Sequence, residues 1–151
     1  MTDANNLFFD VGDKTALVCV DNIEHQNPLV EALTEMEFKV HVGVFLEDIS
    51  AKMSNHTYDI LIIADNFMGA TMEDNPVLKT VQSQPMGARR SQLTILLSES
   101  LATADKISGF IYSVGLTLNP ADISQLQVLV RKTLAENEEF YRTFKVTGKQ
   151  L

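Results

Sequence analysis

The stretch YDILIIADNFMGA, residues 58–70, decides the fold. Its centre, residues 60–64, is a run of apolar side chains that ends in the acidic turn Asp65-Asn66. A short apolar run without alternation is typical of a strand that helices cover on both faces of a parallel sheet. The stretch therefore predicts a central strand whose carboxyl end carries polar side chains, where such sheets place their ligand sites.

Further strands and helices are predicted along the rest of the chain. Residues 16–20 (ALVCV) and 93–97 (LTILL) are apolar runs of the same kind, and residues 116–118 form a short fifth candidate. Residues 38–44 alternate between apolar and polar side chains, which predicts an edge strand. Helical patterns fill the gaps, with predicted starts at Asn27-Pro28, residue 46, Asn75-Pro76, Thr103 and Asn119-Pro120. Five alternating β and α segments predict an α/β fold with an open parallel sheet.

Composition excludes several classes of function. The chain has 151 residues, enough for one domain, and 20 acidic against 12 basic residues give a net charge of −8. This charge repels nucleic acid and anionic lipid, so we expect neither as a partner. No apolar run reaches the roughly 18 residues of a membrane span, which predicts a cytoplasmic protein. The single cysteine, Cys19, lies in an apolar run and is interpreted as a core thiol.

Polar residues follow the predicted strands at comparable places. They are Asp21-Asn22 after the first strand, Ala64-Asp65-Asn66 after the third, Ser98 after the fourth and Asn119-Pro120 after the fifth. Over residues 14–135 this arrangement resembles the receiver domain of bacterial response regulators. The resemblance implies a flavodoxin-like (CheY-like), doubly wound five-stranded sheet in the order 2-1-3-4-5, with three layers α/β/α. Residues 1–13 then form an N-terminal lead and residues 136–151 a helical C-terminal extension.

The resemblance also implies a chemistry. Receiver domains bind Mg²⁺ with an acidic pair after the first strand and an aspartate after the third, which accepts the phosphoryl group. A hydroxyl after the fourth strand and a lysine after the fifth contact the phosphoryl oxygens. Asp21 and Asn22 take the positions of the acidic pair, Ser98 keeps the hydroxyl, and Asn119 replaces the lysine. Asn119 is also interpreted as a helix cap, and the family's bond before this proline is often cis.

The acceptor position is the largest departure from the family. Four apolar residues separate Asp59 from the acceptor in the family pattern, which puts Ala64 at that position and Asp65 one residue late. Asn66 matches the family turn, whereas Met68 replaces the usual proline. Because neighbouring strand residues point to opposite faces, we expect the carboxylate of Asp65 to face away from the pocket. The alternative is a local bulge that returns it to the site.

These departures predict a receiver-like module without catalytic activity. Its vestigial phosphorylation pocket comprises Asp21, Asn22, Ala64, Asp65, Asn66, Ser98 and Asn119, and neither a cofactor nor a metal is expected. The alternative is an active single-domain response regulator that is phosphorylated on Asp65, with Mg²⁺ held by Asp21 and Asp65. The spacing of His25, His41 and His56 does not indicate a metal site, and we expect all three on the surface.

The predicted function is protein contact, with another signalling protein or with a second copy. The resemblance assigns this role to the face around residues 107–112 and 122–132. The C-terminal extension adds aromatic side chains at helical spacing, which either fold back or pair with another subunit. The predicted interface comprises Ile107, Phe110, Ile111, Tyr112, Phe140, Tyr141 and Phe144. A purely structural dimerisation domain is a weaker alternative.

Overall fold

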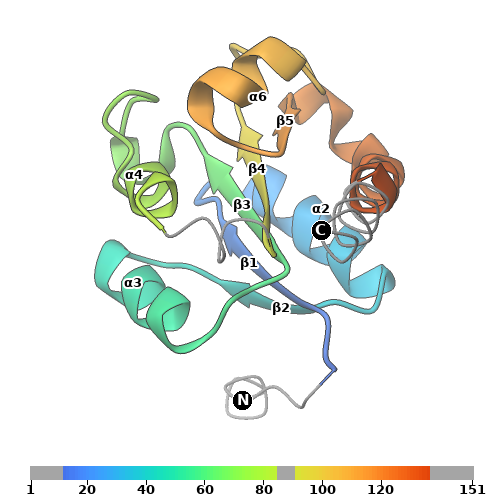
Figure 1. Ribbon diagram of the computed structural model, residues 1–151, viewed down its shortest axis with the longest axis horizontal. Coiled ribbons are helices and arrows are strands. Elements are labelled where there is room, and N and C mark those ends of the chain that lie inside the picture. The colour runs from blue at the N-terminus through green and yellow to red at the C-terminus, as the bar shows by residue number, and fades with distance from the viewer. Residues whose placement is uncertain (1–11, 85–90, 137–151) are drawn as a thin grey trace, which may run out of the picture.

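The computed structural model describes residues 12–84 and 91–136. These residues form a five-stranded parallel sheet with helices on both faces (Figure 1). The strands are β1 (Thr15–Cys19), β2 (Lys39–Val42), β3 (Ile60–Ala64), β4 (Leu93–Leu97) and β5 (Leu116–Leu118). Their spatial order is β2-β1-β3-β4-β5, which confirms the predicted flavodoxin-like fold.

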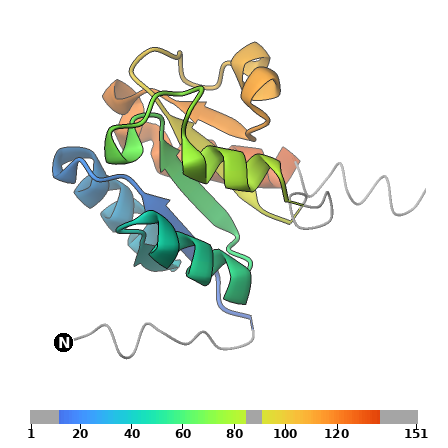
Figure 2. The same ribbon diagram turned by 90° about the vertical axis from the view of Figure 1, so that its left-hand side faces the viewer.

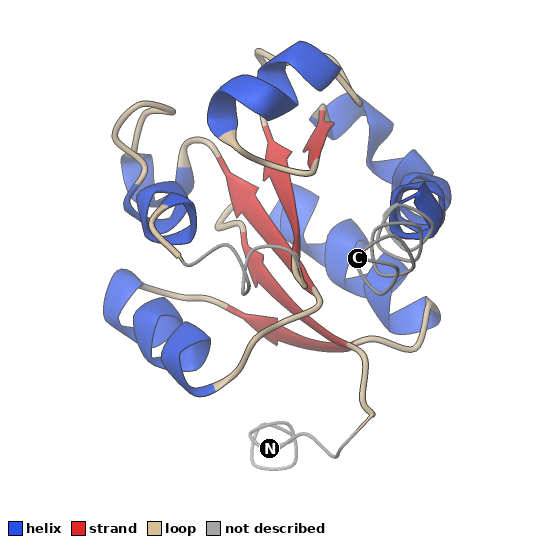
Figure 3. Cartoon of the chain, viewed as in Figure 1, coloured by secondary structure: helices blue, strands red, loops and turns tan. Residues whose placement is uncertain are grey.

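The strand β3 lies at the centre of the sheet. β3 lies between β1 on one side and β4 on the other (Figure 3). Every residue of these three strands is buried. Helices cover both faces, so each isoleucine of β3 loses its contact with water, which stabilises the fold by about 1.5–3 kcal/mol per side chain. Among the described strands β2 pairs only with β1, and it is partly exposed, as its alternating pattern predicted.

The helices form two outer layers (Figures 1 and 2). α2 (Ile23–Glu35) and the helical residues 126–136 cover one face, and α3 (Leu46–Asn55) and α4 (Pro76–Gln82) cover the other. α6 (Lys106–Tyr112) packs against β5 at the margin of the sheet. In the described ranges no helix is both long and apolar enough to span a membrane.

The start of α2 differs from the prediction. Pro28 was predicted at the first helical position, but it lies inside α2, which begins at Ile23. The Oδ1 atom of Asn22 accepts a hydrogen bond from the backbone N–H of Glu24 at 3.0 Å and caps the helix. A side-chain cap directly after β1 therefore decided the start. Pro28 has no N–H to donate to the carbonyl of Glu24, and Glu24 is exposed.

The start of α6 is also corrected. Asp105 caps this helix by accepting from the backbone N–H groups of Ile107 and Ser108, and hydrogen bonds from Ser108 lower the pKa of the Asp105 carboxyl. The hydroxyl of Thr103, the predicted cap, instead donates to Asp122 at 2.6 Å. A carboxylate two residues nearer the helix outcompeted the threonine.

Candidate functional site

The carboxyl edge of the sheet continues the strand register by one residue. The backbone N–H of Asp65 donates to the carbonyl of Leu97 at 2.9 Å, and that of Ser98 donates to Leu118 at 3.0 Å. In a parallel ladder these bonds make Ser98 the partner of Asp65 and Asn119 the partner of Ser98. Partners on adjacent strands point to the same face. Asp65 and Ser98 therefore share a face at this edge.

The carboxylate of Asp65 turns toward β4. The hydroxyl of Ser98 donates to its Oδ2 atom at 2.9 Å, and the same hydroxyl oxygen accepts the backbone N–H of Ser100 at 3.1 Å. The prediction that Asp65 faces away from the pocket is therefore wrong. A count of residues along β3 from Asp59 does not give the direction of Asp65, because that direction depends on its register with Ser98. No inserted residue is needed, because the ladder between β3 and β4 is regular up to this point.

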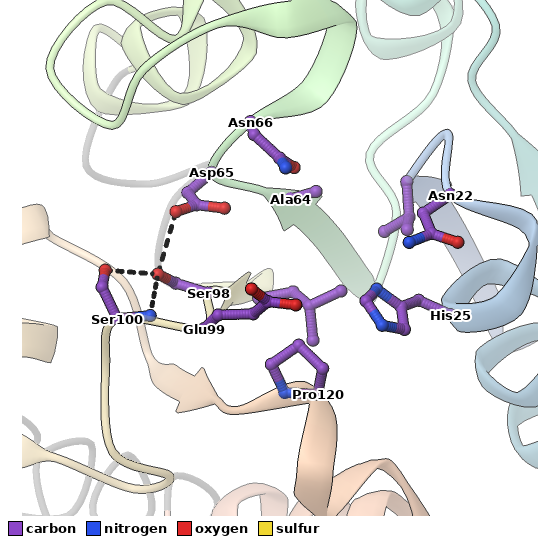
Figure 4. A pocket seen from close by; sticks show the side chains of 11 residues that line it. Asn22, His25, Ala64, Asp65, Asn66, Ser98, Glu99, Ser100 and Pro120 are labelled. Carbon is purple, nitrogen blue, oxygen red and sulfur yellow. Dashed lines mark hydrogen bonds between the residues drawn. The ribbon is translucent and has the colours of Figure 1, made fainter.

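Beside Asp65 lies a cavity of about 300 Å³, drawn in Figure 4. It is bounded by the carboxyl ends of β1, β3 and β4 and by the starts of α2 and η2 (Pro120–Gln125). Its lining includes five residues predicted for the site, which are Asn22, Ala64, Asp65, Asn66 and Ser98, together with Val20, His25, Leu97, Glu99, Ser100 and Pro120. Two predicted residues, Asp21 and Asn119, are not part of the lining.

Asp21 is held by the turn after β3. Its Oδ2 atom accepts the backbone N–H of Met68 at 2.9 Å. Met68 has φ 57° and the next residue, Gly69, has φ 74°. A proline at position 68 has no N–H to donate and cannot adopt a positive φ. Met68 therefore provides both the backbone conformation and the N–H donor that binds Asp21.

The side chain of Asn119 binds the loop that follows β4. Its Oδ1 atom accepts the backbone N–H of Ala121 at 3.0 Å, which confirms the predicted cap. Its Nδ2 atom donates to the carbonyls of Leu101 at 3.0 Å and Glu99 at 3.3 Å. The Asn119–Pro120 bond is trans, since the described residues contain no cis peptide bond. Asn119 therefore shapes the rim of the cavity and directs no group into it.

A buried asparagine holds the carboxyl end of β3. Asn75 is fully buried, and its Oδ1 atom caps α4 by accepting the N–H groups of Val77 and Leu78. Its Nδ2 atom donates to the carbonyls of Ala64 at 2.8 Å and Asp65 at 3.1 Å. The Asn75-Pro76 pattern predicted the cap but not these two bonds, because nothing local in the sequence says which strand a cap will touch. Asn75 thus joins the start of α4 to the end of β3.

Solved structures of other proteins share the fold of this chain. No model of a known family and no curated protein matches the sequence. Solved structures do match. The chain has the fold of a receiver domain. A putative response regulator from Chloroflexus aurantiacus is 20% identical, with a TM-score of 0.62 over 82% of this chain and 98% of that chain.

Two further solved structures have the same fold as this chain. HP1043, an orphan response regulator of H. pylori, is 17% identical, with a TM-score of 0.60 over 82% of this chain and 98% of its own. A CheY-like receiver domain from Methylobacillus flagellatus is 19% identical, with a TM-score of 0.60 over 81% of this chain and 99% of its own. Identities this low establish the fold, and the chemistry depends on the side chains of this receiver-like chain.

The residues present do not fit the Mg²⁺ ion that receiver domains bind. Asp21 is outside the lining of the cavity, and the Asn22 oxygen already accepts the N–H of Glu24. Within residues 12–84 and 91–136, no group of three or more His, Cys, Asp or Glu side chains is arranged to hold a metal ion. Mg²⁺ requires hard oxygen ligands, usually with one or two carboxylates close together. This donor set does not supply that arrangement.

Sequence reasoning missed four lining residues with polar or ring side chains: His25, Glu99, Ser100 and Pro120. A signal for Glu99 and Ser100 existed, because both directly follow Ser98 at the carboxyl end of β4. His25 was interpreted as a surface residue, and it is half-buried on the wall of the cavity. Its position depends on the start of α2, which the Asn27-Pro28 pattern misplaced.

The predicted interface divides into a described and an undescribed part. On α6, Ile107, Phe110 and Ile111 are 73%, 87% and 63% exposed, whereas Tyr112 is half-buried against the core. Three neighbouring apolar side chains this exposed are unusual for a solvated helix. The predicted contact residues Phe140, Tyr141 and Phe144, with the rest of the C-terminal extension, lie outside the described residues.

Proposed function

We propose that this chain is a receiver-like module that signals in the cytoplasm by binding another protein, without accepting a phosphoryl group. The observation that carries the proposal is the contact made by Asp21. Asp21, the remaining acid of the family pair, accepts the backbone N–H of Met68 and lies outside the lining of the cavity. The acid that would hold a metal ion beside Asp65 is therefore engaged elsewhere.

Charge supports the same proposal. A phosphoryl group adds about two negative charges, which receivers neutralise with a metal ion and a lysine. Among residues 12–84 and 91–136, no lysine or arginine lines the cavity, and Glu99 adds a further carboxylate. The side chain of Asn119, at the lysine position, is engaged with the carbonyls of Glu99 and Leu101. A phosphoryl group on Asp65 would therefore face like charge without a cation.

The surface offered for protein contact is the outer face of α6. The exposed side chains of Ile107, Phe110 and Ile111 supply apolar area, which interfaces bury at their centre. The partner is another signalling protein or a second copy of this chain. Sedimentation separates the two: a dimer that dissociates in Phe110→Ser identifies a second copy, and this variant should fold normally because Phe110 is 87% exposed.

A second candidate function has one observation in its favour. Asp65 lines the cavity and accepts a hydrogen bond from Ser98 at 2.9 Å, so an acid and the retained hydroxyl lie together. This arrangement suits a response regulator that is phosphorylated on Asp65. It lacks the acidic partner and the lysine, which is why we rank it below the contact module.

Phosphorylation from a small phosphodonor decides between the two. The chain is incubated with acetyl phosphate and Mg²⁺, and its intact mass is measured, with Asp65→Asn as the matched variant. We expect the masses of both proteins to stay unchanged. A phosphate-sized gain that disappears in Asp65→Asn would establish the second candidate and refute the proposal. A receiver domain known to accept the group serves as the positive control.

A further inference from the structure

The cavity at the carboxyl edge is acidic. The carboxylates of Asp65 and Glu99 lie on its wall, and the described part of the chain contributes no lysine or arginine to its lining. The starts of α2 and η2, which would favour an anion, are capped by the side-chain oxygens of Asn22 and Asn119. Electrostatics therefore favour a cation in this cavity and disfavour phosphate.

Several acceptors in the cavity are unused. Within the described chain, the Glu99 carboxylate and the Asn66 amide make no hydrogen bond or ion pair, and the Oδ1 atom of Asp65 has no donor. Figure 4 shows Asp65, Asn66 and Glu99 on one side of the cavity, with Asn22 and His25 across from them. The ligand that fits must donate several hydrogen bonds in different directions.

We infer that the cavity receives the guanidinium group of an arginine side chain from the partner protein. A guanidinium is a planar cation with five N–H donors, which suits two carboxylates and an amide oxygen better than the single charge of an ammonium group. A volume of about 300 Å³ is at the small end of ligand pockets and fits one side chain. The inference rests on the proposed function and names the chemistry that its partner presents.

The surroundings indicate an arginine carried by a protein. Ile23, which follows Asn22 in the chain, is 57% exposed, and Met68, two residues after Asn66, is 51% exposed. Apolar side chains next to a charged cavity resemble the centre of a protein interface, where arginine is enriched. The stem of an arginine is apolar and packs on such side chains while its head binds the carboxylates.

The test uses the full chain labelled with ¹⁵N and three probes. N-acetyl-argininamide is titrated while the backbone amide shifts are followed, and N-acetyl-citrullinamide gives a neutral probe of the same shape. Inorganic phosphate is the anionic probe. We expect saturable shifts at Asn66, Glu99 and Ser100 with the arginine probe, binding at least tenfold weaker with citrulline, and no saturable shift with phosphate.

Two variants locate the site. Glu99→Gln removes one charge from the wall of the cavity and should weaken arginine binding at least fivefold. Glu37→Gln removes the same charge from an exposed residue just before β2, at the opposite edge of the sheet, and should bind as the wild type does. Glu99 is exposed, so both variants should fold.

The inference would be overturned if the arginine probe did not saturate up to about 50 mM, which corresponds to binding weaker than about 2 kcal/mol. Equal binding of the citrulline probe, or unchanged binding of the arginine probe by Glu99→Gln, would also overturn it. Saturable binding of phosphate at the same amides would also refute it. The mass measurement with acetyl phosphate answers a different question, because it concerns Asp65 as an acceptor. A chain that gains no phosphate and binds no arginine keeps the proposed function and loses only this inference.

Discussion

Two aspartates stand at the two ends of β3, and the protein uses them differently. Asp59, before the strand, accepts the backbone N–H of Thr15 at 2.8 Å and so joins the start of β1 to the start of β3. Asp65, after the strand, accepts one hydroxyl from Ser98 and keeps its other oxygen at the wall of the cavity. An aspartate thus joins two strands at one edge of the sheet, and an aspartate at the other edge is available to a ligand.

The amino edge around Asp59 is a satisfied polar network. The hydroxyl of Thr15 lies 2.9 Å from Nε2 of His56, and the hydroxyl of Tyr58 lies 2.8 Å from Nδ1 of His41. The ring of Tyr58 packs edge-on against both histidine rings, and burial raises the pKa of its hydroxyl. These contacts explain why the histidines, expected on the surface, are half-buried. Polar groups at this edge stabilise the fold.

The largest effect should come from the residue that supports the open edge. Asn75→Ala removes a double cap and leaves the buried carbonyl of Ala64 and that of Asp65 without the Asn75 donor. A lost cap costs about 1 kcal/mol and buried unpaired groups cost about 1–3 kcal/mol each, so we expect a loss of about 3 kcal/mol in urea unfolding.

The matched control for that prediction is Asn119→Ala, which also removes an asparagine cap before a proline. Asn119 is half-buried and its amide bonds carbonyls of a loop, so we expect a loss of about 1 kcal/mol. If the two variants lose equal stability, Asn75 acts only as a cap, and the proposed link between α4 and the end of β3 is unnecessary.

An intermediate effect is expected at the amino edge. Asp59→Ala leaves the backbone N–H of Thr15 without its acceptor, and Thr15 is 1% exposed, so water cannot replace the bond. An unpaired buried donor costs about 1–3 kcal/mol, and we expect about 2 kcal/mol in urea unfolding at neutral pH. A loss below about 0.5 kcal/mol would mean that Asp59 does not hold β1 to β3.

The three Asn-Pro pairs show when a local sequence pattern predicts the start of a helix correctly. At Asn75 and Asn119 the pattern predicted the helix start correctly, since an asparagine cap and a proline in the first turn are compatible with any helix. At Asn27 the same pattern failed, because Asn22 caps α2 immediately after β1. A local signal identifies an allowed start, and the length of the preceding connection selects among the candidates.

The candidate site shows the same limit in another form. Apolar runs predicted the buried strands, and the alternation of residues 38–44 predicted the edge strand. Both predictions were possible because the faces of a strand that are buried decide which of its side chains are apolar. These patterns did not predict the direction of Asp65, which is set by pairing with a strand some thirty residues later in the chain. They also did not show that Met68 would bind Asp21, because that contact requires a positive φ at a methionine. Contacts between the ends of strands that are far apart in the sequence can be predicted only when the pairing register of those strands is known.

The smallest effect on stability should come from Asp65. Asp65→Ala removes one hydrogen bond at a half-buried position, and the hydroxyl of Ser98 still contacts that of Ser100 at 2.8 Å. We therefore expect urea unfolding to change by no more than about 0.5 kcal/mol, a quarter of the Asp59→Ala effect. The same variant should weaken the binding of N-acetyl-argininamide at least fivefold, because it removes half of the acidic wall. A loss of stability as large as that of Asp59→Ala would show that both ends of β3 serve the fold, and the difference between the two edges would then have no functional meaning.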